Sequence, residues 1–115
     1  MARTVFEKSP EWLRRTIGEI AKKGNPAEIL NDRIAMYRNL VLSDMSMVAS
    51  RLAMLGCPPL PTEDPIEAVW EMEDRKYEYD ARMHGALSLL RTDAIILFHA
   101  EQASELLRQE AEPEA

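Results

Sequence analysis

The sequence predicts an all-α protein, and the placement of helix breakers is the main reason. Its 115 residues include only four glycines, and six of the seven prolines fall within residues 10–65, clustered in short breaks. Long stretches are therefore free of both breakers, which favours helix. With 46% apolar and 30% charged residues, the chain has enough apolar material to build a core. We expect a single helical domain spanning residues 1–115.

A capping side chain followed by proline marks three helix starts: Ser9-Pro10, Asn25-Pro26 and Asp64-Pro65. The side chain accepts a free backbone N–H of the first turn, and proline lacks an N–H that would need a partner there. Gly24 and Gly56 stand where glycine commonly ends a helix. The expected helices therefore cover residues 10–23, 26–55 and 65–110, followed by a frayed acidic tail at 111–115.

The last two of these helices should form a long antiparallel hairpin. The connection, residues 56–64, is short and proline-rich, so it should reverse the chain, and facing residue numbers then sum to about 121. A helix over 65–110 would be about 69 Å long, against about 45 Å for the helix over 26–55. The longer helix should overhang, and self-association should complete the hairpin into a helical bundle.

The helix over 26–55 carries two apolar strips. The first advances in steps of three or four and predicts a core stripe: Leu30, Ile34, Tyr37, Val41, Met45, Val48, Leu52 and Leu55. The second strip consists of Met36, Leu40, Met47 and Met54, and one neighbouring helix cannot cover both strips. Residues 86–100 of the third helix are also nearly uncharged. We therefore expect a dimer interface formed by residues from both regions: Met36, Leu40, Met47, Met54, Leu90, Ile96 and Leu97.

Polar residues recur on one face of the expected third helix, in steps of four, three and four: Glu73, Tyr77, Asp80 and His84. In the expected register Tyr77 faces Asp44, and His84 faces Tyr37. These six residues are the candidate polar layer. A structural role is favoured because buried polar groups are normally hydrogen-bonded. They are also the candidate ligands if the chain is half of a ferritin-like bundle, and whether they hold a metal stays open.

Charge and cysteine usage restrict the partners. The net charge is −6, and because residues 1–25 carry +3, the remainder carries −9. An acidic body repels a phosphate backbone, so duplex nucleic acid is disfavoured. The lone Cys57 cannot form an intrachain disulfide, which fits the reducing cytoplasm. The longest apolar run, residues 94–98, is far below the roughly 20 residues needed to cross a bilayer, so no membrane is expected.

Motifs for catalysis are missing from the sequence. It has no glycine-rich phosphate loop, no HExxH, no paired-cysteine spacing and no Glu-x-x-His pair, so we predict neither a catalytic residue nor a cofactor. The leading hypothesis is a non-catalytic interaction or accessory subunit that forms a homodimer and docks a protein partner through apolar helix faces. One alternative is a half-bundle that dimerises to bind a metal or small ligand. Another is an acidic inhibitor of a protein with a basic groove.

Overall fold

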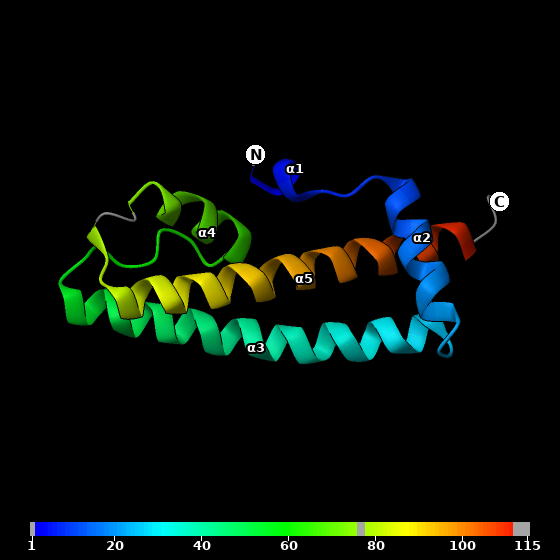
Figure 1. Cartoon of the computed structure of the whole chain (residues 1–115), viewed down its shortest axis with the longest axis horizontal. Coiled ribbons are helices and arrows are strands. Elements are labelled where there is room, and N and C mark those ends of the chain that lie inside the picture. The colour runs from blue at the N-terminus through cyan, green and yellow to red at the C-terminus, as the bar shows by residue number, and fades with distance from the viewer. Residues whose placement is uncertain (1, 76–77, 112–115) are drawn as a thin grey trace.

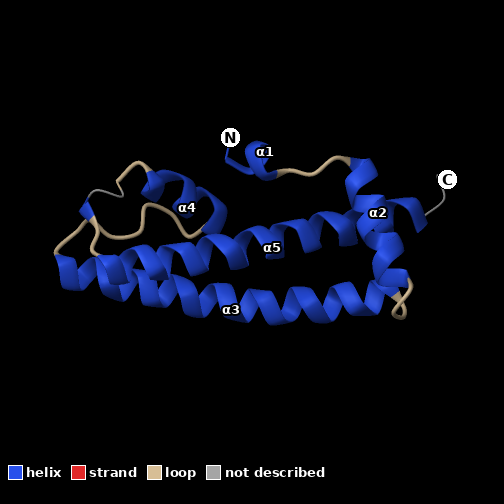
Figure 2. Ribbon diagram, viewed as in Figure 1, coloured by secondary structure: helices blue, strands red, loops and turns tan. Residues whose placement is uncertain are grey.

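The computed structural model describes residues 2–75 and 78–111, and within these ranges it contains helices and loops but no strand (Figures 1 and 2). The all-α fold class is confirmed. The elements in chain order are α1 (Ala2–Phe6), α2 (Pro10–Ala21), α3 (Pro26–Leu55), α4 (Pro65–Glu73) and α5 (Ala81–Ala111). The chain is elongated, with extents of 53 × 26 × 22 Å.

The helix starts use the predicted caps. Asn25 Oδ1 accepts the Glu28 N–H at 3.2 Å at the start of α3, and Ser9 Oγ accepts the Trp12 N–H at 3.2 Å at the start of α2. Gly56 ends α3 in the left-handed conformation at φ 67°, which glycine adopts without a steric penalty. The bounds predicted for α3 are therefore confirmed, because local capping chemistry decides both of its ends.

The expectation of one continuous helix over 65–110 was wrong. The chain leaves helix after Glu73, and a new helix begins at Ala81. Asp80 marks the second start, because its Oδ1 accepts the Met83 N–H at 2.8 Å and so acts as an N-cap. The break lets α4 fold back along α5, which buries Ile66, Val69 and Met72. In a straight helix, that apolar stripe would have no surface to pack against.

The hairpin is therefore formed by α3 and α5, which run antiparallel along the length of the molecule (Figure 1). Asp44 meets Asp93, and Arg38 Nη2 lies 3.0 Å from Glu101 Oε2, so facing residue numbers sum to 137–139. The expected register of about 121 was wrong, because residues 56–80 form a long connection that includes α4. The two helices have 30 and 31 residues, so the predicted overhang is absent as well.

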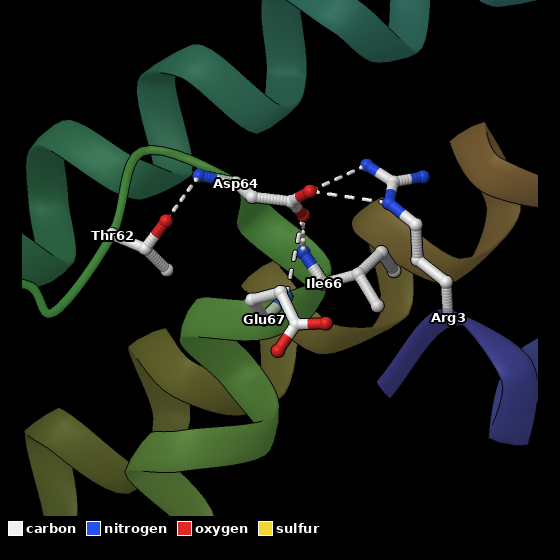
Figure 3. A network of polar contacts seen from close by, with 5 residues as sticks. All are labelled: Arg3, Thr62, Asp64, Ile66 and Glu67. Carbon is white, nitrogen blue, oxygen red and sulfur yellow. Dashed lines mark hydrogen bonds and ion pairs between the residues drawn. The ribbon is translucent and has the colours of Figure 1, made fainter. Parts of the chain in front are cut away.

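The short helices attach to the hairpin at different places. Figure 1 shows α2 crossing the pair near the start of α3, and α2 contacts both long helices. Helix α1, which the sequence did not predict, packs on α4, and the rings of Phe6 and Trp70 meet edge to face at 6.2 Å. Figure 3 shows the polar contact between the same two elements, where the Arg3 guanidinium donates to the Asp64 carboxylate.

Most of the predicted core stripe of α3 is buried. Five members are at most 9% exposed: Leu30, Ile34, Val41, Val48 and Leu52. Tyr37 and Met45 are half-buried, whereas Leu55, predicted to be in the core, is 38% exposed at the end of the helix. Their partners on α5 include Met83, Leu90 and Ala94. The regular three-and-four spacing on both helices allows these side chains to interdigitate along the whole hairpin.

Candidate functional site

Two aspartates meet inside the seam between α3 and α5. Asp44 is 5% exposed and Asp93 is 8% exposed, and their side chains lie within hydrogen-bonding reach of each other. Asp44 Oδ2 is buried and, within residues 2–75 and 78–111, has no hydrogen-bond partner. Buried carboxylates are normally paired with donors, so an acceptor left unpaired here carries a free-energy cost.

The environment of this pair changes the titration of Asp44. Burial is the largest cause, followed by the hydrogen bond that protonated Asp44 donates to Asp93 and by the nearby Asp93 charge, and together they raise the pKa of Asp44 to about 6. No basic side chain is among the groups that shift this pKa. Asp44 therefore keeps its proton to a higher pH than an ordinary aspartate, because both burial and the neighbouring carboxylate disfavour its charged form.

Apolar side chains surround the aspartate pair on one side of the hairpin. Leu40 and Met47 lie four residues before and three after Asp44, so they border it on α3, and their side chains are 41% and 47% exposed. Leu89 borders Asp93 in the same way on α5 and is 48% exposed. We call this surface the apolar face, defined by the exposed side chains Met36, Leu40, Met47 and Met54 of α3 and Leu89 of α5.

The other side of the hairpin is only partly covered, and Leu42 there is 68% exposed. Residues 60–63, Pro65 and three residues of α3 (Val41, Leu42 and Met45) line a hollow of about 610 Å³ there, and α4 packs on α5. At one end of the apolar face, α2 contributes Trp12 to a smaller hollow shared with Ile96. The apolar face therefore occupies the stretch of hairpin that neither α2 nor α4 shields.

The predicted interface residues divide into two groups. Met36 and Met54 are 53% and 75% exposed and, with Leu40 and Met47, belong to the apolar face. Leu90 and Leu97 are instead buried in the core of the chain, and Ile96 is half-buried beside α2. Sequence reasoning placed these three on a free surface because it assumed an overhang. It missed Leu89, and an exact register was needed to find it.

The predicted polar layer does not assemble. Asp80 caps α5, Glu73 Oε1 pairs with Arg91 Nε at 3.2 Å, and the His84 ring lies against the Tyr79 ring at 6.3 Å. His84 is nine residues before Asp93 on α5, so the two are about 13 Å apart along the helix. Of the other two predicted members of the layer, Tyr37 is half-buried beside the core, and Tyr77 lies outside the described residues.

Asp93 is the functional candidate that sequence reasoning missed. The stretch over 86–100 has only two charged residues, Arg91 and Asp93, and that scarcity was a usable signal. A lone carboxylate within an apolar helical face is expected to have a specific partner. Naming Asp44 as that partner required the true register of the hairpin.

His99, the second histidine, has a structural position. Its Nε2 lies 2.8 Å from the Phe6 carbonyl oxygen, and its ring packs on Trp12 at 5.4 Å. It therefore connects α1, α2 and α5. Across the described part of the chain, no group of three or more His, Cys, Asp or Glu side chains is arranged to hold a metal ion.

Comparison with known proteins found no match: no family model, no curated protein and no solved structure is similar to the chain. Among the described helices, none combines the length and the apolar character that crossing a bilayer would require. The function is therefore inferred from the apolar face and the aspartate pair beneath it.

Proposed function

We propose that this protein is a non-catalytic helical interaction subunit that self-associates through the apolar face. The observation that carries the proposal is the exposure of Met36, Leu40, Met47 and Met54, which range from 41% to 75% exposed along one side of a single helix. A continuous row of exposed apolar side chains on a small protein is typical of an interaction surface. Methionine suits such a surface because its side chain is flexible and polarisable.

A closed twofold dimer is the simplest assembly for such a face. Twofold pairing joins the same surface on both copies, so one strip of side chains covers the other. A further protein partner would dock through apolar helix surface that the dimer leaves exposed, where Leu42 is 68% exposed. Val48, which is fully buried, supports the fold of each copy and takes no part in this contact.

Sedimentation velocity at micromolar concentration tests the proposal directly. The expected species has about twice the 13.1 kDa chain mass. Replacing Met54, which is 75% exposed, by glutamate should give a folded monomer, because a charge within an apolar contact has to be desolvated. A wild-type protein that sediments as a 13.1 kDa monomer with native helicity would overturn self-association.

A second candidate is a half-bundle that dimerises to bind a metal ion. The paired carboxylates of Asp44 and Asp93 favour it, since oxygen ligands suit hard divalent cations. Two carboxylates are too few for such a site, so a second copy would have to complete it. Elemental analysis of the purified protein separates the candidates: a stoichiometric metal supports the half-bundle, and its absence supports the interaction subunit.

A further inference from the structure

Three residues of the apolar face repeat at intervals of seven. Leu40, Met47 and Met54 are 41%, 47% and 75% exposed and belong to α3. Seven residues make nearly two turns of helix, so these side chains lie along one line of α3, as in the seam of a coiled coil. Met47 lies at the centre of this line, with Leu40 and Met54 seven residues away on either side. The line can therefore pack against the same line of a second copy that runs in the opposite direction.

Two charged residues repeat at the same interval beside that line. Asp44 and Arg51 follow Leu40 and Met47 by four residues each, so both lie along the same edge of the face. Arg51 is half-buried and makes no hydrogen bond or ion pair with any described residue, while Asp44 Oδ2 lacks a donor. The two residues are about 10 Å apart along α3, and Arg51 does not affect the pKa of Asp44.

These repeats determine which orientation of two copies is favourable. In an antiparallel pair centred on Met47, Leu40 meets the second copy's Met54, and Asp44 meets its Arg51. In a parallel twofold pair, the Asp44 and Arg51 side chains of the two copies would lie on opposite edges of the contact, so neither residue would meet its opposite charge. Only the antiparallel orientation joins opposite charges across the contact, so it is favoured.

We propose that two copies pack α3 against α3 in an antiparallel twofold dimer centred on Met47, in which Arg51 of each copy binds the Asp44–Asp93 pair of the other. This inference rests on the proposed self-association and adds its geometry. The guanidinium has five N–H donors and no acceptor, so it fits a carboxylate pair in which Asp44 Oδ2 has no donor. Its positive charge is also complementary to the acidic pair, so the contact joins opposite charges.

Cross-linking tests the orientation. In a Cys57→Ser background, which removes the only native thiol, Leu40→Cys protein is mixed with Met54→Cys protein and treated with a short thiol-specific cross-linker. We expect efficient cross-linking in the mixture and little when either variant is treated alone. Strong cross-linking of Leu40→Cys with itself would overturn the antiparallel arrangement, as would the absence of any cross-link in a protein that sediments as a dimer.

Substitution of the arginine tests the charge contact. Arg51→Ala should raise the dimer dissociation constant at least tenfold, because it leaves the buried carboxylates unpaired. Arg15, an exposed arginine of α2 without a described partner, is the matched control, and Arg15→Ala should leave the constant within twofold. If the two substitutions change the dimer dissociation constant equally, the proposed role of Arg51 is overturned. A wild-type monomer would overturn both the proposed function and this inference, whereas a dimer lacking these signatures would overturn this inference alone.

Discussion

Arg3 Nη2 lies 2.8 Å from Asp64 Oδ2, an ion pair between residues 61 positions apart. The other oxygen of the same carboxylate accepts the N–H groups of Ile66 and Glu67, so Asp64 both caps α4 and attaches α1 to it (Figure 3). Burial alone would raise the pKa of Asp64. Arg3 and the two N–H donors outweigh that effect, and the pKa is lowered below its ordinary value.

Arg3→Ala should loosen α1 from α4 without unfolding the hairpin. The substitution removes the ion pair and the contact of the guanidinium with the Phe98 ring, 5.1 Å from its centroid. Because both charged partners are partly exposed, the expected loss in unfolding free energy is only about 1 kcal/mol. Hydrogen exchange should speed up in α1 and at the start of α4. Unchanged exchange there would show that the Phe6–Trp70 contact suffices to hold α1.

Asp44→Asn should stabilise the monomer at neutral pH. The folded-state pKa of Asp44 is raised to about 6 from 3.8, so its favourable contribution is complete below about pH 3.8 and is lost as the pH rises through 6. The variant should therefore be more stable than its parent at pH 7, by about 1–3 kcal/mol, and no more stable at pH 3.5.

Urea unfolding at several pH values measures this difference. A Met54→Glu background is needed, because Arg51 of a second copy would otherwise neutralise the aspartate pair. Asp32→Asn, at an exposed position of α3, is the control and should show no such gain. A gain for Asp44→Asn that is independent of pH would contradict the raised pKa of Asp44 as its cause.

Met47→Glu and Val48→Glu should have opposite consequences although the residues are adjacent. Met47 is 47% exposed on the apolar face, so its substitution should leave a folded chain that no longer dimerises. Val48 is fully buried between α3 and α5, so a carboxylate there should unfold the chain, at a cost of several kcal/mol. Circular dichroism and sedimentation together distinguish the two outcomes. An unfolded Met47→Glu protein would show that the face supports the fold of each copy.

Two glycine substitutions should also have opposite effects. At Gly85, within α5, an added Cβ meets no atom within 4 Å, so Gly85→Ala should raise the unfolding free energy by about 0.5–1 kcal/mol. Gly56 has φ 67°, and alanine is strained in that conformation. Gly56→Ala should therefore lower the unfolding free energy by about 1 kcal/mol. Thermal melting measures both. A destabilised Gly85→Ala protein would instead indicate that this position has to bend.

Local chemistry was readable from the sequence wherever a helix end depends on its own neighbours. Asn25 and Gly56 bound α3, and the caps at Ser9 and Asp64 mark two more starts, because each side chain satisfies backbone groups only two or three residues away. The exposed strip of α3 was equally accessible. Its spacing is a property of one helix, and one antiparallel neighbour cannot cover both strips.

The break between α4 and α5 was not readable in this way. Charged residues between 67 and 82 are compatible with a continuous exposed helix, and the N-cap at Asp80 competes only weakly with helix continuation. The deciding contribution is the burial of Ile66, Val69 and Met72 against α5, which needs the chain to reverse. Because that contact joins segments distant along the chain, it outweighs local propensity.

The sequence by itself thus determined the fold class, the extent of α3 and the surplus of apolar side chains on it, since helix formation and capping depend on contacts within a turn or two. Only the tertiary structure decided the hairpin register. That register changed from a sum of about 121 to 137–139 once α4 took part in the connection. It brought Asp44 to Asp93, buried Leu90 and Leu97, and left Leu89 beside Met47. The physical reason is that register is set by the total apolar surface buried between two long helices, a quantity that no single segment contains.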